Sequence, residues 1–261
     1  MLDQITPLIL TYNEAPNIRR TIAKLLWARQ IVVIDSGSTD ETLNILAEYR
    51  QANVIQHPFS DFAAQCNFGL MQVQTPWVLS LDADYELSGE LLKEMANLSP
   101  STTTAGYRAS FIYRINGRAL RGSLYPARVV LYRREAYYQN EGHGHRVLVS
   151  GAVRDLAGAI YHDDRKSLAH WIASQQRYAD EEARYLTDTP AVQLKRADRI
   201  RRMGWPAPLG ILFYVLFVKG CIFDGWAGWS YAMERLVAET LIALALAERR
   251  LRSPANQDRA T

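Results

Sequence analysis

The sequence predicts an α/β fold, with a mostly parallel central sheet, flanking helices and a separate helical region toward the C-terminal end. Two observations support this prediction. In the first hundred residues, short apolar runs rich in β-branched residues alternate with helical patterns, an order typical of a parallel sheet covered by helices. After residue 165, long helical patterns and a basic segment replace the strands. We therefore expect domains at residues 1–165 and 166–261.

The composition is that of an ordinary globular chain with a sizeable core, because 48% of the 261 residues are hydrophobic and 22% are charged. The net charge of +3 gives no reason to expect nucleic acid as a partner. Cys66 and Cys221 show no metal-binding spacing and no disulfide framework, so we expect a reducing compartment. The N-terminus lacks the pattern of a cleaved signal peptide.

The strands and helices of the first domain can be placed in order. We expect strands over residues 7–11, 31–34, 54–55 and 77–81, whose nearly continuous apolar character is typical of strands buried on both faces. Helices are expected over residues 18–27, 42–49 and 61–71, where a helical pattern fits between the strands. Ser38 and Glu41 have the spacing of a capping box for the second helix.

Polar clusters follow three of these strands, at the sheet edge where parallel folds bind ligands. The clusters are Thr11, Tyr12, Asn13 and Glu14 after the first strand, Asp35 and Ser36 after the second, and Asp82 and Asp84 after the fourth. Asp-x-Asp also occurs in solvated turns, but three clusters at neighbouring strand ends favour a single site.

Asp82 and Asp84 are candidate ligands of a metal ion. Residues two apart in an extended chain point to the same side, and carboxylate oxygens suit Mg²⁺ or Mn²⁺, which are usually shared with substrate phosphates. The sequence has no Gly-x-Gly-x-x-Gly after the first strand and no P-loop. A metal is then the natural means of neutralising a diphosphate.

Four segments, in this order, resemble the family 2 glycosyltransferases, and in particular the branch similar to lipopolysaccharide-core glucosyltransferases. The segments are residues 11–14, 33–42, 66–69 and 81–84, within a resemblance that covers about residues 5–165. It implies the GT-A fold, and an inverting transfer from a nucleotide-sugar donor, expected to be a UDP-sugar, to a glycan or lipid-linked acceptor. The pathway implied is bacterial cell-envelope polysaccharide or lipopolysaccharide synthesis.

The resemblance also implies roles for individual residues. Asp35 would bind the nucleotide base, and the segment from Thr11 to Glu14, together with Ser36, would line the same pocket. Asp82 would contact the ribose or the metal, and Asp84 would hold the metal on the diphosphate.

The acceptor side needs a base that takes the proton from the acceptor hydroxyl. Glu141 precedes a stretch rich in glycine and histidine, in a place where GT-A enzymes usually have the catalytic acidic residue, so it is the candidate. The alternative is a surface carboxylate paired with an arginine. His162 ends a late strand, where GT-A enzymes often add a metal ligand, and the alternative is a structural histidine.

The C-terminal region combines a basic segment with a short apolar one. Residues 195–202 include five Lys or Arg, and the apolar run from Met203 to Val218 has 16 residues, fewer than the roughly 20 of a membrane-spanning helix. This pattern fits a peripheral or re-entrant anchor on the cytoplasmic side of the inner membrane. A buried helical hairpin and a dimer interface remain alternatives.

Two other functions compete with a glycosyltransferase. A nucleotidyltransferase normally carries a glycine-rich basic loop after the first strand, where this chain has Tyr12, Asn13 and Glu14. A non-catalytic membrane-bound scaffold would not need polar clusters at three strand ends. Nucleotide binding separates the scaffold from either enzyme.

Overall fold

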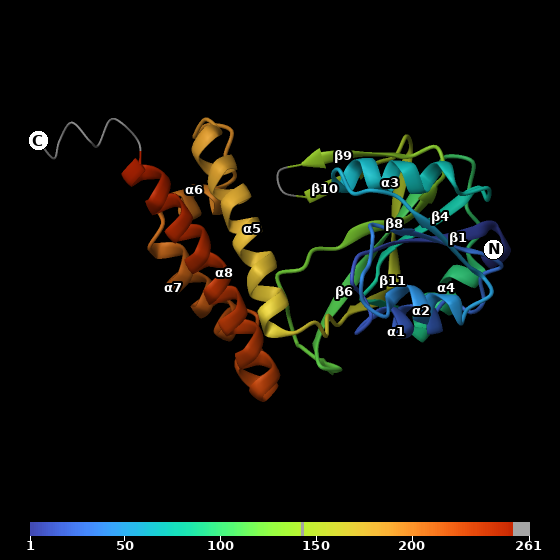
Figure 1. Ribbon diagram of the computed structural model, residues 1–261, viewed down its shortest axis with the longest axis horizontal. Coiled ribbons are helices and arrows are strands. Elements are labelled where there is room, and N and C mark those ends of the chain that lie inside the picture. The colour runs from blue at the N-terminus through green and yellow to red at the C-terminus, as the bar shows by residue number, and fades with distance from the viewer. Residues whose placement is uncertain (142–143, 253–261) are drawn as a thin grey trace, which may run out of the picture. The chain divides into compact units, whose positions relative to one another are not determined.

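The computed structural model describes residues 1–141 and 144–252, and of residues 141, 144 and 145 it describes only the backbone. The chain forms two compact units (Figure 1). The first consists of Met1–Ala119 and Tyr125–Lys166, and the second of Leu120–Leu124 and the residues from Ser167 onward. The short segment Leu120–Leu124 thus belongs to the helical unit, although it lies within the stretch of sequence that builds the sheet.

A mixed sheet forms the centre of the first unit. Its strands are β1 (Ile5–Thr11), β2 (Ile31–Asp35), β3 (Ala52–Gln56), β4 (Trp77–Asp82), β5 (Tyr85–Leu87), β6 (Thr104–Ile115), β7 (Arg118–Ala119), β8 (Arg128–Arg133) and β11 (Ala152–His162). Their order among the described residues is β3-β2-β1-β4-β8-β6-β11-β5, with β7 beside β6. The run from β3 to β4 is parallel, whereas β8 is antiparallel to both of its neighbours.

Helices cover both faces of the parallel part of the sheet. They are α1 (Ile18–Ala23), α2 (Thr42–Ala47), α3 (Phe62–Met71) and α4 (Gly89–Asn97), with the short 3-10 helix η1 (Leu2–Gln4) before β1. Ile31 and Val33 of β2 pack in one hydrophobic core with α1 and α4, while Val32 and Ile34 pack in a second core with α3. Figure 1 shows α3 on one side of the sheet and the other three helices on the opposite side. The expected α/β class, with strands buried on both faces, is confirmed.

The capping box predicted for α2 is wrong. The Ser38 hydroxyl donates a hydrogen bond to Asp35 Oδ2 at 2.5 Å, and the side chain of Glu41 does not cap the helix. Asp40 binds the start of the helix instead, because its Oδ1 accepts the backbone N–H of Thr42 at 3.0 Å. The buried carboxylate of Asp35 outcompetes the helix terminus for the serine.

The structure also adds a hairpin to the prediction. Strand β9 (Tyr137–Glu141) pairs antiparallel with β10 (Gly144–Leu148). The side-chain amide of Asn67 in α3 pairs with the backbone of β9 as a neighbouring strand would. It donates to the Tyr138 carbonyl at 3.0 Å and accepts the Tyr138 N–H at 2.8 Å. The face of α3 therefore fixes the path of β9.

A close approach between β11 and α4 makes Gly158 a sensitive position. The Gly158 N–H donates to Glu94 Oε2 at 2.9 Å, and a Cβ at this residue would overlap the backbone of Leu91. We expect Gly158→Ala to lower the free energy of unfolding by about 3 kcal/mol, the upper range for overpacking. Urea unfolding measures the change.

The matched control for this substitution is Gly89→Ala, at the first residue of α4, the helix that Gly158 contacts. A Cβ at Gly89 meets no described atom within 4 Å, so we expect a change within about 0.5 kcal/mol, as for ordinary surface positions. Equal stability of the two variants would contradict the close packing of β11 on α4.

The second unit is helical. It contains α5 (Leu168–Asp188), α6 (Arg196–Met203), α7 (Pro206–Phe213), the π-helical turn η2 (Tyr214–Val218), the 3-10 turn η3 (Cys221–Asp224) and α8 (Gly225–Arg252). Ser167 caps α5, because its hydroxyl accepts the His170 N–H at 3.3 Å. Ala183, Leu186, Leu194 and Leu246 form a small buried core. The expected C-terminal helical region is therefore present.

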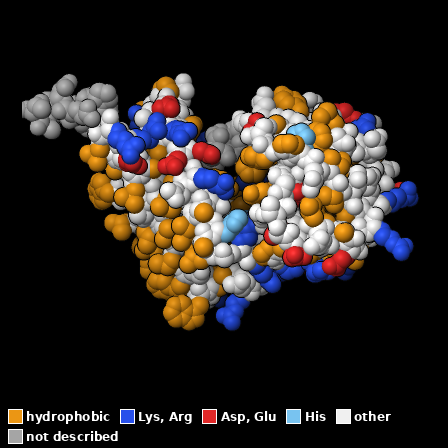
Figure 2. Space-filling view, in the orientation of Figure 1, with side chains coloured by type: hydrophobic (Ala, Val, Ile, Leu, Met, Phe, Trp, Pro, Cys, Tyr) orange, Lys and Arg blue, Asp and Glu red, His pale blue; other side chains and the backbone are white. Residues whose placement is uncertain are grey.

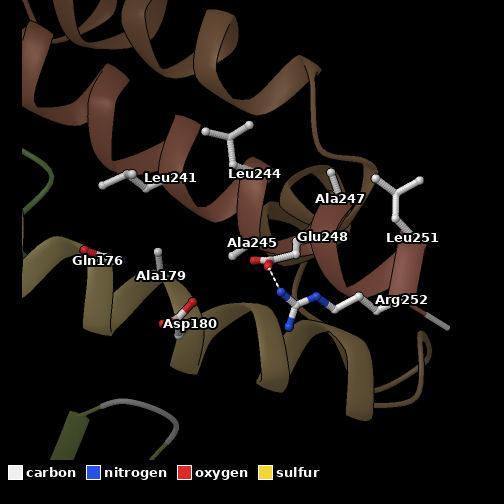
Figure 3. Close-up of a pocket in the computed structure, with 10 residues that line it drawn as sticks. All are labelled: Gln176, Ala179, Asp180, Leu241, Leu244, Ala245, Ala247, Glu248, Leu251 and Arg252. Carbon is white, nitrogen blue, oxygen red and sulfur yellow. Dashed lines mark ion pairs between the residues drawn. The ribbon is translucent and has the colours of Figure 1, made fainter.

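A groove of about 590 Å³ runs between α5 and α8 (Figure 3). Leucines from α8, namely Leu241, Leu244 and Leu251, form much of its lining. The ion pair between Arg252 and Glu248, 2.5 Å long, joins two lining residues of α8. The groove is thus largely apolar with a charged margin.

In the part of the chain that the structure describes, no single helix is long and apolar enough to cross a membrane. The segments Pro206–Val218 and Cys221–Arg252 are bent by 70° relative to each other. Taken together, they are long and apolar enough to cross a membrane, by length and composition only.

One arginine of the basic segment points into the helical unit. Arg201 Nε donates to Glu239 Oε1 at 2.8 Å, and its guanidinium lies 3.7 Å from Glu182 and 3.6 Å from Asp198. Burial acts to lower the pKa of Arg201, but its hydrogen bonds to Glu239 and the charges of the neighbouring carboxylates outweigh it and raise the pKa. Arg201 is therefore the charged centre of the helical packing.

Candidate functional site

Parallel pairing brings the carboxyl ends of β1, β2 and β4 together at one edge of the sheet. The register places Thr11 opposite Asp35 and Leu10 opposite Asp82. The polar clusters that follow these strands consequently share one edge, with β1 in the middle. This edge is the candidate site.

Asp35 organises the turn after β2. Its carboxylate is fully buried and accepts hydrogen bonds from the Thr11 hydroxyl at 2.9 Å, the Ser38 hydroxyl at 2.5 Å, and the N–H groups of Gly37 and Ser38 at 3.0 and 2.8 Å. Ser36, next to it, accepts a hydrogen bond from the Gln65 amide at 2.9 Å. Asp35 thus ties the first two polar clusters together, and its contact with a nucleotide base stays a prediction.

Asn13 and Asp40 lock the loop after β1 onto the loop after β2. Asn13 has a positive φ of 54° and accepts the Thr39 N–H at 2.8 Å, while its own N–H donates to Ser38 Oγ at 2.9 Å. Asp40 Oδ2 accepts the Ala15 N–H at 3.1 Å. Next to these anchors the side chain of Tyr12 is exposed, so it is available to a ligand at the sheet edge.

Glu14 is held in a network that joins the first helix to the end of β11. Its carboxylate forms an ion pair with Lys166 and accepts a hydrogen bond from Asn17 Nδ2 at 3.0 Å. The same amide nitrogen of Asn17 donates to Asp164 at 2.8 Å. Burial raises the pKa of Glu14 to about 7, against the lowering effect of Lys166, and the charge of Asp84 adds to the rise.

Asp84 lies beside His162, with 3.0 Å between Asp84 Oδ2 and His162 Nε2. Burial acts to raise the pKa of Asp84, but the neighbouring His162 holds it below the usual value. For His162, burial acts to lower the pKa, while the charge and hydrogen bond of Asp84 outweigh it and raise the pKa. The structure thus brings together two of the three predicted metal ligands.

Aromatic rings surround His162. The rings of Tyr85, Tyr113 and Tyr125 have centroids 5.2, 4.7 and 4.7 Å from the imidazole. The guanidinium of Arg128 lies over the Tyr125 ring at 4.7 Å. Burial and the charge of Asp82 raise the pKa of Tyr125, so its hydroxyl stays protonated even well above neutral pH.

The residues at this edge fit a shared metal ion rather than a self-sufficient metal site. Among residues 1–141 and 144–252, no group of three or more His, Cys, Asp or Glu side chains is arranged to hold a metal. Asp84 Oδ1, however, is buried and has no hydrogen-bond partner among the described atoms, and Asp82 is exposed on the same strand end. Such a pair suits a hard cation that takes its other ligands from water and a diphosphate.

The predicted base, Glu141, is the last residue of β9, and its side chain lies outside what the structure describes. Asn67 holds the backbone of this strand at Tyr138, which lies three residues before Glu141. The role of Glu141 stays a prediction.

Sequence reasoning missed several residues of this edge. Asn17 and the run Asp163, Asp164, Arg165 and Lys166 are joined to Glu14 and Arg20 by hydrogen bonds. The run follows β11 as a fourth polar cluster at a strand end, and that position was a usable signal. Asn17 and Tyr125 stand in no pattern that distinguishes them in the sequence.

The fold and the site define a mixed α/β domain with an acidic, polar edge at the carboxyl ends of its parallel strands. The family model described as glycosyl transferase family 2 matches residues 8–153, which is more than half of the chain. The chain belongs to glycosyl transferase family 2. The family expected from the sequence is therefore confirmed.

Several known proteins are similar to this chain. An uncharacterized glycosyltransferase of Rickettsia bellii is 36% identical over 107 residues, covering 41% of this chain and 36% of that protein. The lipopolysaccharide core biosynthesis glycosyltransferase LpsC of Rhizobium meliloti is 32% identical over 113 residues, or 41% of each chain. The chain thus matches less than half the length of these curated relatives.

Among solved structures, S. aureus TarS 1-349 in complex with UDP-GlcNAc aligns with 94% of this chain and 91% of that chain. The sequence identity is 15% and the TM-score is 0.45.

Proposed function

We propose that this protein is an inverting glycosyltransferase that moves a sugar from a UDP-sugar to a glycan or lipid-linked acceptor during synthesis of cell-envelope polysaccharide or lipopolysaccharide. The observation that carries the proposal is the shared edge of β1, β2 and β4, with Asp35, Asp82 and Asp84 at the strand ends of a family 2 chain. Similarity to LpsC, named for lipopolysaccharide core biosynthesis, supports the envelope role.

On the donor side, the wall of the nucleotide pocket consists of the segment from Thr11 to Glu14 and of Asp35 and Ser36. Their mutual hydrogen bonds fix the pocket before a ligand arrives, which lowers the entropy cost of binding. Asp84 and Asp82, with His162 beside them, would hold Mg²⁺ or Mn²⁺. When bound, such an ion neutralises the charge that develops on a departing diphosphate.

On the acceptor side, we propose Glu141 as the general base that takes the proton from the attacking hydroxyl. Its position at the end of β9 is supported by the hydrogen bonds between Asn67 and Tyr138. A carboxylate in this role must reach hydrogen-bond distance of the acceptor oxygen. We further propose that the enzyme works at the cytoplasmic face of the inner membrane, bound peripherally or through a re-entrant segment.

Calorimetric titration of the full chain with UDP and UDP-sugars, with and without Mn²⁺, tests the donor assignment. We expect nucleotide binding that weakens at least tenfold when EDTA removes the metal, since a charge-neutralising ligand of the diphosphate is lost. Nucleotide release on adding membrane lipid extract should identify the donor sugar.

Two outcomes would overturn the proposal. Release of pyrophosphate from UTP and a sugar 1-phosphate would identify a nucleotidyltransferase. Absence of binding to every nucleotide and nucleotide-sugar would indicate a scaffold.

A further inference from the structure

The helical unit exposes a long surface that is poor in charge. From Met203 to Ala247, all of which the structure describes, every strongly exposed residue is uncharged, and Lys219, Glu234 and Arg235 are half-buried. Several of these are large, including Trp226 at 86%, Trp205 at 76% and Phe223 at 73% exposure. Soluble proteins rarely expose contiguous apolar surface of this kind unless it binds something.

Two acidic residues of this stretch are turned away from solvent. The nearly buried Asp224 accepts the Arg121 N–H at 2.9 Å and forms an ion pair with the Arg121 guanidinium at 3.3 Å. Glu239, also nearly buried, is bound by Arg201. The fold thus satisfies Asp224 and Glu239 internally, and the strongly exposed side chains of this stretch are all uncharged.

The exposed residues follow helical spacing. Leu209, Phe213 and Phe217 lie four apart along α7 and η2, and Trp226 and Trp229 lie three apart at the start of α8. The opposite sides of the same helices are already packed, since Val215, Leu216, Ala227 and Tyr231 are buried. Helices that are apolar on all sides need a non-aqueous partner on the outer side.

We call these residues, with Phe223 between them, the apolar face: Leu209, Phe213, Phe217, Phe223, Trp226 and Trp229. Figure 2 shows hydrophobic side chains gathered over the left and lower parts of the helical unit in this view, with Lys and Arg gathered at its upper end.

Basic residues flank the apolar face at both ends. At one end, Lys195 and, in α6, Arg196 and Arg199 are exposed, and the Arg250 guanidinium of α8 donates to the Arg202 carbonyl. This contact brings the basic ends of α6 and α8 together. At the other end Arg121, 66% exposed at its side chain, lies next to Asp224 of η3.

We propose that the apolar face docks in the plane of an anionic bilayer surface, with its aromatic side chains among the headgroups and upper acyl chains and the flanking cations on lipid phosphates. Tryptophan and phenylalanine suit this depth, and exposed arginines suit anionic lipid. Arg121 beside η3 opposes deep insertion of that end, because a cation is costly in the bilayer core.

A second copy of the chain fits this surface less well than a bilayer does. Both ends of the apolar face carry arginines, so a copy stacked on it in either direction would place cations against cations, which is unfavourable. The purpose of this docking rests on the proposed function, because docking would bring the candidate site to a lipid-linked acceptor.

Vesicle flotation of the full chain tests the proposal. We expect binding to phosphatidylcholine vesicles that contain phosphatidylglycerol, and weaker binding without it. The triple variant Phe213→Ser/Phe217→Ser/Trp226→Ser should lose at least roughly a hundredfold in vesicle affinity, since each buried aromatic contributes about tenfold. Lys195→Glu/Arg196→Glu should weaken binding only to the anionic vesicles.

The matched control is Leu26→Ser/Met71→Ser, which removes two similarly exposed apolar side chains of the first unit and should leave flotation unchanged. Circular dichroism confirms that each variant is folded. Equal flotation of the triple variant and the wild type would overturn the proposal, as would a wild-type dimer that does not float and that the triple variant converts to a monomer. Retention after alkaline carbonate extraction would overturn in-plane docking.

UDP binding measured without vesicles separates this inference from the proposed function. The triple variant should bind UDP as the wild type does. Flotation without any nucleotide binding would contradict the proposed function and leave the docking in place, whereas nucleotide binding without flotation would contradict the docking alone.

Discussion

Asp84→Asn should lower the rate of sugar transfer about a thousandfold or more, a loss typical of removing a charged group that stabilises developing charge. The asparagine keeps the shape of the side chain but removes the negative charge from the buried edge next to His162. It also replaces one carboxylate oxygen with an NH₂ group, which cannot bind a cation. Turnover of the UDP-sugar donor, followed as nucleotide release, is the measurement.

Asp155→Asn is the matched control, because Asp155 is an exposed carboxylate on β11, the strand that ends at His162, and it pairs with Arg108 at the surface. Its turnover should stay within about twofold of the wild type, as expected for a solvent-exposed ion pair. A thermal melt shows whether each variant is folded. An Asp84→Asn enzyme with unchanged turnover would remove Asp84 from the proposed metal site.

The second large effect is on stability. Arg201→Met should lower the free energy of unfolding by about 3–5 kcal/mol, the usual cost of removing one partner from a buried ionic group. The methionine fills the space of the arginine stem, but Glu239, Glu182 and Asp198 lose their cation while remaining nearly buried. Urea unfolding of the full chain measures the loss.

This loss should depend on pH. In the variant, burial without a cation raises the pKa values of the three carboxylates above their unfolded values. Stability then falls as pH rises through the raised pKa values, so the variant should be closer to the wild type at about pH 5 than at about pH 8. Arg196→Met, an exposed arginine of the same helix, should change stability little at either pH. A loss that is independent of pH would contradict the buried-charge explanation.

The parallel part of the fold was predictable because strands buried on both faces leave a local signal. The runs at residues 31–34 and 77–81 are apolar without alternation except at Ser80, and the structure buries most residues on both sides of them. Helix ends were less predictable. The helix expected over residues 18–27 ends at Ala23, and turns continue the chain so that Leu25 is still buried. The apolar spacing of the sequence correctly indicated that Leu25 is buried. It did not distinguish a helix from the turns that place Leu25 there.

The site was predictable where it lies directly after a strand. Asp35, Asp82 and Asp84 follow from strand ends alone, because parallel pairing must bring those ends together. Asn17 did not, since it acts through Asp164, 147 residues away in the chain, and only the folded sheet makes them neighbours. Likewise, Arg201 sits among other basic residues in the sequence, and nothing local shows that it is the one that binds the buried carboxylates.

The ion pair between Glu14 and Lys166 has a consequence for where the functional domain ends. The family match stops at residue 153, yet a chain cut there would lack Asp163, Asp164 and Lys166. Glu14 would then lose its cation and Asn17 its second carboxylate. The shortest fragment able to form the native network around Glu14 must therefore extend to Lys166, so expression boundaries drawn from the family match would remove part of that network.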